Sequence, residues 1–436
     1  MNEEAKKYCR FLTAPDAETD FKIKYGTEMH RKGFCHLVLK NAGGAPLDHA
    51  EVKVKLTKHA FRFGCNAFMQ GQFPEQEQNA QYEECFASIF NEAVIPFYWS
   101  DLEPEDGKLR FESGSTPIYR RPPPDDVLAF CRKNNITPKG HPLCWHCFMP
   151  EWAPTDPEEF MRRLYRRIKE IAERYGDQIF LFDCVNESQT HFPLKNQRFP
   201  HDYVERVFRM ADPLFPNARL LYNDNQCWWD VQGDCSPVYL LVSRLLEHGC
   251  RVGGLGLQYH MFAGLMQTQS EKFMDPKVLY AALDQFGRLQ IPVNFSEVSV
   301  ISRRDLGNGD LFQELVAEKL YRIWFSHPAV EGITWWNLVD GTAAYAPLGS
   351  ELGENSLRAG LVNYDFTPKP AFRALQNLIK KEWHTETSVD YQEGGDNVFH
   401  GFYGDYTAEI CTDSGTFTKQ FTFSKNTAGT VILKLN

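Results

Sequence analysis

The sequence lacks long apolar runs, both at its start and elsewhere. Its first 20 residues, "MNEEAKKYCRFLTAPDAETD", are polar and charged, with no apolar core of the signal-peptide type. No other window approaches the roughly 20 consecutive apolar residues of a membrane span. We therefore expect a cytoplasmic protein with no membrane partner, or a secreted one if a signal segment has been removed.

The sequence also lacks an excess of positive charge. Its 57 acidic residues outnumber its 47 lysines and arginines, which gives a formal net charge of −10. Nucleic-acid partners require basic patches, so this balance argues against nucleic acid. We expect no such partner.

A cysteine framework is missing as well. The 12 cysteines are scattered along the chain, which suits a reducing compartment. Cys144 and Cys147 form one CxxC pair, "CWHC", with His141 and His146 nearby, but no second pair follows to complete a zinc site. We favour a strand end that contains two thiols, and we expect no metal and no organic cofactor.

What the sequence does contain is enough apolar material for a large core, with 43% hydrophobic and 14% aromatic residues. Short β-rich runs alternate with longer helical segments over most of its length. Eight candidate strands lie at 61–68, 92–97, 136–143, 179–186, 219–224, 253–260, 291–298 and 332–339. Eight strands, each followed by helical or loop sequence, predict an α/β fold of the (β/α)8 TIM-barrel type.

The segment after Trp145 shows how clear the helical signals are. Asp156 is a candidate N-cap, Pro157 fits the first helical position and Gly176 supplies a stop. Apolar residues recur at helical spacing and are expected to face the barrel: Phe160, Leu164, Ile168 and Ile171.

The two ends of the chain have a different pattern, of short alternating strands. After an N-terminal lead over 1–21, the segment 22–60 contains "GFCHLVLK" and "AEVKVKLTK", and "FKIKYG" (21–26) lies at its start. The segment 385–436 is again β-rich, and the barrel is assigned to 61–384. Two or three strands alone make a marginal sheet, so we expect the two end segments to form one small β-sandwich together.

Two glutamates stand at the ends of candidate strands. Glu187 follows Asn186 after the fourth strand, and Glu297 ends the seventh. Reacting groups of TIM barrels lie at the carboxyl ends of strands, and two carboxyl groups there suggest acid–base chemistry on a glycosidic bond. For a single glutamate, the alternative of a surface residue at a loop start would be favoured.

Six stretches carry further motifs in a fixed order: "GHPLCWH" (140–146), "FDCVNES" (182–188), "GLQYH" (256–260), "FSEVSV" (295–300), "GITWWNLVD" (332–340) and "DFTPKPAF" (365–372). Together they resemble glycoside hydrolase family 10, the retaining β-xylanases. The resemblance covers most of residues 61–383, and the β-rich flanks are similar to those of plant-type members.

The resemblance implies roles for particular residues. Glu187 would be the general acid/base, Glu297 the nucleophile, and Asn186 would hydrogen-bond the 2-hydroxyl of the sugar. By the same resemblance, His260 would orient Glu297. Further substrate-binding positions are His141 and Gln258 in the reacting-sugar pocket, Trp336 as its apolar wall, Tyr98, Trp228 and, unless it only packs, Trp145.

The chain departs from the family where it would grip a longer substrate. "VIPFYW" (94–99) replaces the polar Glu-Asn-x-x-Lys pattern, and "NDNQCWW" (223–229) lacks a tyrosine but offers Trp228 or Trp229. These changes favour a retaining β-glycosidase acting on short xylo-oligosaccharides or aryl β-glycosides. Two alternatives stay open: an endo-1,4-β-xylanase on polymeric xylan, and a non-catalytic carbohydrate-binding protein.

Overall fold

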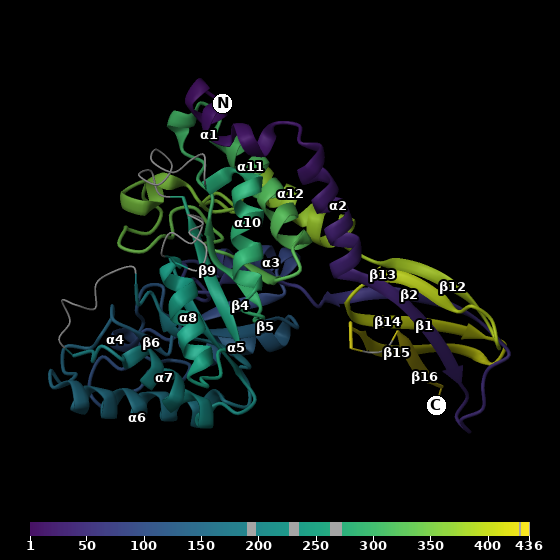
Figure 1. The fold of residues 1–436 in the computed structure, drawn as a ribbon, viewed down its shortest axis with the longest axis horizontal. Coiled ribbons are helices and arrows are strands. Elements are labelled where there is room, and N and C mark those ends of the chain that lie inside the picture. The colour runs from purple at the N-terminus through teal and green to yellow at the C-terminus, as the bar shows by residue number, and fades with distance from the viewer. Residues whose placement is uncertain (190–197, 226–234, 262–272, 427–428, 436) are drawn as a thin grey trace.

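The computed structural model describes residues 1–189, 198–225, 235–261, 273–426 and 429–435. Figure 1 shows a large unit of strands surrounded by helices, with a smaller β-rich unit at its side. The chain begins on the large unit and ends on the small one.

Within the described residues, the large unit is a closed barrel of eight parallel strands. In chain order they are β3 (Arg62–Asn66), β4 (Glu92–Pro96), β5 (Thr137–His141), β7 (Leu181–Asn186), β8 (Arg219–Asp224), β9 (Gly254–His260), β10 (Val293–Ser299) and β11 (Val330–Trp335). The ring closes where β11 pairs with β3, and β5 reaches β7 through Gly140 and Phe182. The two-residue β6 (Cys144–Trp145) pairs with the end of β7. The predicted TIM barrel is confirmed, and each predicted run overlaps one strand.

Helices cover the outside of the barrel (Figure 1). They are α3 (Gln76–Ile89), α4 (Trp99–Leu102), α5 (Pro124–Lys133), α6 (Pro157–Tyr175), α7 (Tyr203–Ala211), α8 (Pro237–Glu247), α10 (Pro276–Gly287), α11 (Gly309–Ser326) and α12 (Pro370–Asn377). Short 3-10 turns lie at η2 (Asp212–Leu214), η4 (Arg304–Leu306) and η5 (Gly353–Leu357), and a π-turn lies at η6 (Leu378–Glu382).

Helix α6 follows its predicted signals closely. The Asp156 side chain accepts a hydrogen bond of 2.9 Å from the backbone N–H of Glu159, and the helix ends before Gly176. This cap satisfies one of the backbone donors that a helix start leaves without a partner. The four apolar side chains at helical spacing are buried, as predicted: Phe160, Leu164, Ile168 and Ile171.

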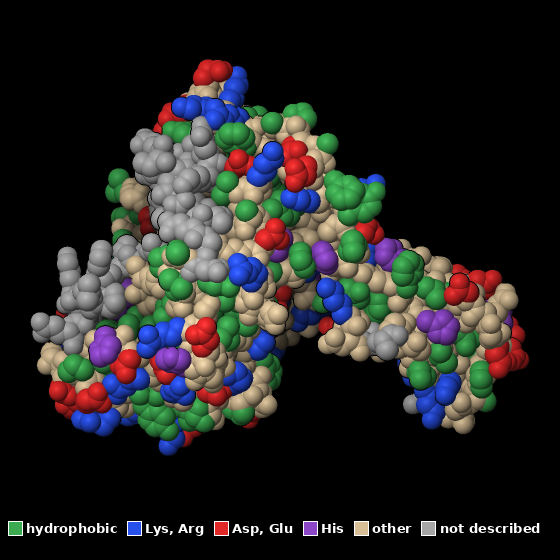
Figure 2. Space-filling view, viewed as in Figure 1, with side chains coloured by type: hydrophobic (Ala, Val, Ile, Leu, Met, Phe, Trp, Pro, Cys, Tyr) green, Lys and Arg blue, Asp and Glu red, His purple; other side chains and the backbone are tan. Residues whose placement is uncertain are grey.

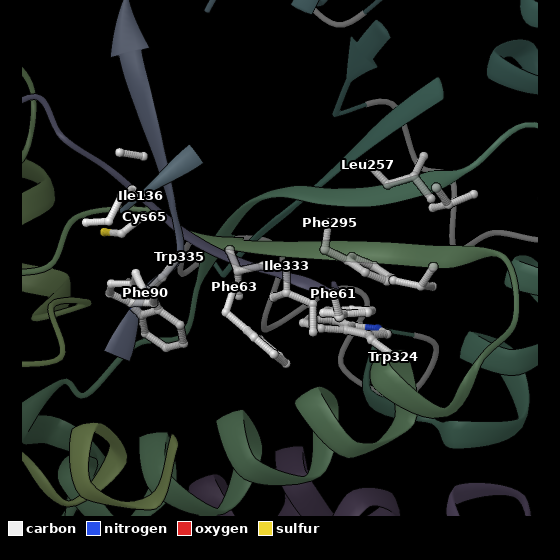
Figure 3. Close-up of a cluster of buried hydrophobic side chains, with 14 of the residues drawn as sticks. Phe61, Phe63, Cys65, Phe90, Ile136, Leu257, Phe295, Trp324, Ile333 and Trp335 are labelled. Atoms are coloured by element: carbon white, nitrogen blue, oxygen red, sulfur yellow. The ribbon is translucent and has the colours of Figure 1, made fainter. Parts of the chain in front are cut away.

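The core between strands and helices is rich in aromatic rings. Figure 3 shows Phe295 of β10 and Trp324 of α11 beside Phe61 and Ile333. The rings of Phe295 and Trp324 stack with centroids 3.8 Å apart. Large buried rings leave little free volume, so this packing restricts how the strands can shift and fixes the positions of their carboxyl ends.

The small unit is a β-sandwich built from both ends of the chain. One sheet has the order β13–β1–β16 and the other β12–β2–β14–β15. The strands are β1 (Lys32–Lys40), β2 (His49–His59), β12 (Glu386–Gln392), β13 (Val398–Phe402), β14 (Gly404–Thr412), β15 (Gly415–Phe423) and β16 (Thr430–Lys434). Phe399 of one sheet packs on Tyr406 of the other, with ring centroids 5.4 Å apart. The predicted pairing of the two ends into one sandwich is confirmed.

The strand predicted at "FKIKYG" (21–26) is wrong. These residues belong to α2 (Ala17–Arg31), which follows α1 (Glu3–Thr13). Asp16 caps α2, and Gly26 lies against α11, where an added Cβ would come within 2.5 Å of the Ser326 carbonyl oxygen. Alternation over six residues resembled a strand, but the cap and the contact with a distant helix select the helix.

The visible surface carries charges of both signs, interspersed rather than gathered in one patch (Figure 2). Among the helices of the described residues, none combines the length and the apolar character needed to cross a membrane.

The contact between the end of α2 and the barrel generates a stability prediction. Arg31 is 8% exposed, and its guanidinium donates to the carbonyl oxygens of Phe325, His327 and, at 2.6 Å, Val330. Replacing it with methionine leaves three buried carbonyl groups without this donor. We expect Arg31→Met to lower the midpoint of thermal unfolding by about 3 °C or more.

Calorimetric or circular-dichroism melting curves measure this change. The matched control is Lys24→Met on the exposed side of the same helix, which we expect to alter the midpoint by less than about 1 °C. Equal effects of the two substitutions would contradict the assigned role of Arg31.

Candidate active site

The carboxyl ends of β7 and β10 bring the two predicted glutamates into one pocket. Glu187 directly follows β7, and Glu297 lies within β10; both line a cavity of about 310 Å³. Their side chains are almost enclosed, since the residues are 9% and 4% exposed. Two carboxyl groups buried in one cavity cannot both ionise at low cost, so their environments must differ.

A chain of amide groups links the two carboxyl groups. The Nδ2 of Asn223 donates to Glu297 Oε1 at 2.9 Å and to Asn186 Oδ1 at 2.7 Å. On the other side, Gln258 Nε2 donates to Glu187 Oε1 at 2.9 Å and lies 3.5 Å from the same Asn186 oxygen. Each carboxyl group therefore has a fixed donor, and the whole set is held in one orientation.

The pKa of Glu187 is raised to about 8, first by burial and then by the negative charge of Glu297. The hydrogen bond from Gln258 acts in the opposite direction and is outweighed. At neutral pH, Glu187 is therefore a carboxylic acid that can donate a proton. Its backbone adopts a left-handed φ of 51°, which costs free energy for a residue with a side chain and directs the group to this place.

Glu297 is oriented by two further residues. Its Oε2 lies 3.2 Å from His260 Nε2, and the Nδ1 of that ring lies 2.9 Å from Ser299 Oγ. An ionised carboxylate can only accept a hydrogen bond, so with Glu297 ionised the proton of a neutral His260 sits on Nε2 and Ser299 donates to Nδ1. The predicted contact between His260 and Glu297 is present.

His141 stands on the opposite side of Glu297, with its Nε2 4.0 Å from Oε1. Its Nδ1 lies 2.8 Å from Asp183 Oδ2, which also pairs with Lys139 at 3.0 Å. Burial acts to raise the pKa of Asp183, but Lys139 and His141 outweigh it and leave that pKa below its usual value. An ionised Asp183 thus holds the His141 ring in place.

Aromatic side chains form the remaining wall of the pocket. The Trp336 ring packs against His141 and Phe68, with centroids 5.6 Å and 5.2 Å apart. Tyr98 packs edge-on against His141 at 5.7 Å and lies 5.6 Å from Trp145. The flat, apolar face that a sugar ring needs is available there.

Apart from Trp228, every predicted site residue lies at this pocket: Glu187, Glu297, His141, Trp145, Asn186, Gln258, His260, Trp336 and Tyr98. Trp228 lies outside the described residues. The catalytic and binding roles of these residues stay predictions.

Comparison with known proteins identifies the family. Residues 54–378 match the model of Glycosyl hydrolase family 10. This chain belongs to glycosyl hydrolase family 10. It is 25% identical over 412 residues to Endo-1,4-beta-xylanase 2 of Arabidopsis thaliana, covering 92% of this chain but only 34% of that protein. The chain therefore spans about a third of the length of that relative.

Two further xylanases match this chain over smaller shares of its length. Beta-1,4-xylanase of Dictyoglomus thermophilum is 25% identical over 270 residues, covering 57% of this chain and 74% of that one. The crystal structure of xylanase 10B from Thermotoga petrophila RKU-1 in complex with xylobiose has a TM-score of 0.59 and 21% identity, covering 74% and 95% of the two chains. At this identity, the structural match shows a shared fold.

Several site residues of this family 10 chain were not predicted from its sequence. Asn223, whose amide bonds both Glu297 and Asn186, lies near the end of β8, and its signals were this strand-end position and its place at the start of "NDNQCWW". Arg120 and Arg121 line the pocket beside Tyr98, just before the proline-rich stretch "PPPDD" (122–126). The part of the pocket near Tyr98, for which "VIPFYW" predicted apolar side chains, therefore also carries two guanidinium groups.

The "CWHC" pair contributes a pocket wall. Cys147 lines the cavity, and burial raises the pKa of its thiol to about 11 and that of Cys144 to about 12. Protonated thiols are poor metal ligands and poor nucleophiles. Among the described residues, no group of three or more His, Cys, Asp or Glu side chains is placed to hold a metal ion.

The raised pKa of Glu187 predicts a pH-dependent stability difference. In the unfolded chain this carboxyl group ionises near its ordinary pKa of 4.5, and in the folded protein near 8. The folded state thus loses stability as the pH rises through this interval. Glu187→Gln cannot ionise, so its thermal unfolding midpoint should match the wild type at about pH 5 and exceed it by several degrees at about pH 9.

The control variant is Glu354→Gln, which removes an exposed carboxylate from the rim of the same pocket. We expect its difference from the wild type to stay constant between these two pH values. If the Glu187→Gln difference were equally constant, the assigned ionisation behaviour of Glu187 would be wrong.

Proposed function

We propose that this chain is a retaining β-glycosidase of the xylanase type, which cleaves β-1,4-linked xylose chains. The observation that carries the proposal is the pair of buried carboxyl groups with unequal environments. Glu187 is held protonated by burial and by Glu297, while Glu297 receives hydrogen bonds from Asn223 and, when ionised, from His260. One acid and one carboxylate facing the same cavity are the two groups that double displacement requires.

In the first step, a Glu297 carboxylate oxygen attacks the anomeric carbon of the bound sugar while Glu187 gives its proton to the leaving glycosidic oxygen. The bond to the leaving sugar breaks, and a glycosyl–Glu297 ester forms. The loss of charge on Glu297 removes the second cause of the high Glu187 pKa. The deprotonated Glu187 is therefore stabilised when it is needed as a base.

In the second step, Glu187 takes a proton from water, and the oxygen of that water attacks the anomeric carbon. The ester bond breaks and restores the Glu297 carboxylate and the Glu187 acid. Asn186 supports both steps, because its Oδ1 is held by Asn223 while its Nδ2 donates to none of the described residues and can bond a sugar hydroxyl. Trp336 offers the apolar wall for the ring.

The family supports a xylose chain as the substrate. Relatives in Arabidopsis thaliana and Dictyoglomus thermophilum are named endo-1,4-beta-xylanase and beta-1,4-xylanase, and the Thermotoga petrophila enzyme was crystallised with xylobiose. Short oligosaccharides or aryl β-glycosides are a second candidate, favoured by the apolar cluster of Phe68, Val94 and Tyr98, whose member Tyr98 lines the pocket. The pocket end beside Tyr98 is nevertheless polar as well, since Arg120 and Arg121 line it.

A substrate comparison tests the proposal. We expect release of reducing ends from polymeric xylan, with retention of the β-anomer in the first product seen by proton NMR. Glu297→Ala should lower kcat by about 10⁴-fold or more on xylan, since it removes the attacking group. Faster turnover of nitrophenyl β-xyloside than of xylan would favour the short-substrate candidate.

Other outcomes would overturn the proposal. An inverted anomer would show that Glu297 is not a nucleophile. Binding of xylo-oligosaccharides without hydrolysis of any β-glycoside would favour a non-catalytic carbohydrate-binding protein.

The Glu187 acid also predicts the pH profile of catalysis. Activity should fall as the pH rises through about 8, because the proton donor is then lost. Gln258 stabilises the ionised form of Glu187, so Gln258→Leu should raise the pKa and move this alkaline limb of kcat/KM to higher pH. Values of kcat/KM measured over a series of buffers at constant ionic strength give the alkaline limb of the wild type and of Gln258→Leu.

The matched control for this profile is Gln313→Leu, which removes a buried glutamine that bonds Val300 and Gly360 away from both glutamates. Its alkaline limb should coincide with that of the wild type. A limb that stays in place in Gln258→Leu would show that Glu187 is not the group being titrated.

A further inference from the structure

One cation in the wall of the pocket has no acidic partner. Arg120 is 3% exposed and lines the same cavity as the two glutamates, yet within the described residues it forms no ion pair. The carboxylate that raises its pKa is Glu354, which is solvent-exposed and too distant for a salt bridge. Burial, together with neighbouring Arg121, lowers the pKa of Arg120. Burying an unpaired charge is costly, so this position needs an explanation.

The other cations of the pocket wall are neutralised. Arg121 pairs with Asp101 at 2.7 Å. Arg358 lies 3.7 Å from Asp340, which also pairs with Lys369 at 2.8 Å. Arg120 therefore lines the same pocket as Arg121 and Arg358 but lacks the carboxylate partner that each of them has.

The hydrogen bonds of Arg120 use only one of its three nitrogens. Nη1 donates to Asn337 Oδ1 at 2.7 Å and to the carbonyl oxygen of Thr342. Nε is buried without an acceptor, and Nη2 donates to none of the described residues. Because Nε has no accessible surface for a ligand, Nη2 is the donor left for an anion in the cavity, and a charged N–H group of this kind bonds a carboxylate or sulfate oxygen strongly.

The guanidinium is also held rigidly. Arg120 has a left-handed φ of 60°, an uncommon conformation for a residue with a side chain. Its guanidinium lies over the Phe68 ring at 5.4 Å, and that of Arg121 covers the Tyr98 ring at 3.8 Å. A guanidinium held in place loses little entropy when it binds an anion.

The position of Arg120 relates it to the reacting sugar. Its partner Asn337 directly follows Trp336, the apolar wall that packs on His141 and His260. An anion held by Arg120 would therefore sit beside the ring that faces Glu187 and Glu297, at the end of the pocket formed by Tyr98.

We propose that Arg120 binds an anionic group, either the carboxylate of a uronic acid or a sulfate ester, carried by the sugar chain next to the cleaved unit. The proposal deepens the proposed function and rests on it, since it names the substrate class of the same pocket. The anion would supply the counter-charge that Arg120 lacks, which gives acidic substrates an advantage over neutral ones of equal length.

The experiment compares acidic oligosaccharides with neutral copies of the same shape. Xylo-oligosaccharides bearing glucuronic acid are assayed beside the same mixture after reduction of its carboxyl groups to alcohols. A third sample, of sulfated xylo-oligosaccharides, distinguishes a sulfate from a carboxylate. We expect kcat/KM of the wild type for one of the two acidic samples to exceed that for the neutral sample by about tenfold or more.

Three variants separate recognition from folding. Arg120→Gln should remove the preference for the acidic sample, and Arg120→Lys should retain part of it, because the charge stays but the planar guanidinium is lost. Arg304→Gln, which alters an exposed arginine that pairs with Glu351 and does not line this pocket, should keep the wild-type ratio. The readout is the ratio of acidic to neutral kcat/KM within each variant, which a general loss of folded protein leaves unchanged.

Each outcome decides the question. A wild-type ratio near one, or a ratio that Arg120→Gln leaves intact, would overturn the inference while the proposed function stands. If the wild type hydrolyses none of the samples, the proposed function fails, and calorimetric binding of the same samples to the wild type and Arg120→Gln then tests the anion site alone.

Discussion

The burial of the Glu187 carboxyl group beside Glu297 is the constraint on which the rest of the site depends. Two buried acids that face one cavity cannot both carry a charge at low cost, so one proton is retained and its place is set by the surroundings. Glu187 keeps the proton because burial and Glu297 raise its pKa to about 8. Glu297 has hydrogen-bond partners on both oxygens, Asn223 on Oε1 and His260 on Oε2.

The ends of the barrel strands supply the different surroundings of Glu187 and Glu297. Asn186 and Glu187 come from the end of β7, Asn223 from β8, Gln258 from β9 and Glu297 from β10. Neighbouring parallel strands place these side chains within hydrogen-bond distance, so amides from β8 and β9 can connect carboxyl groups from β7 and β10. The aromatic packing outside the strands, such as Phe295 on Trp324, limits movement of these ends.

The parts outside the barrel are tied to it by polar as well as apolar contacts. Arg31, at the end of α2, reaches carbonyl groups at the end of α11 and at the start of β11. It thereby connects the N-terminal helices, the sandwich strand β1 and the barrel. Among the cations of the pocket wall, Arg121 and Arg358 have carboxylate partners, whereas Arg120 bonds only neutral oxygens of the described chain.

The sequence by itself determined the features that depend on neighbouring residues. Periodicity and caps located the eight barrel strands and helix α6, and motif order indicated Glu187 and Glu297 with most of their companions. Tertiary structure decided what depends on distant partners. Gly26 lies in a helix because α11 packs against it, and the Asn223 amide bonds Glu297, which lies 74 residues further along the sequence. Arg120 lies in a loop, and the local sequence there does not predict that its side chain lines the pocket. In each case the deciding energy comes from a contact across the fold, which local sequence does not encode.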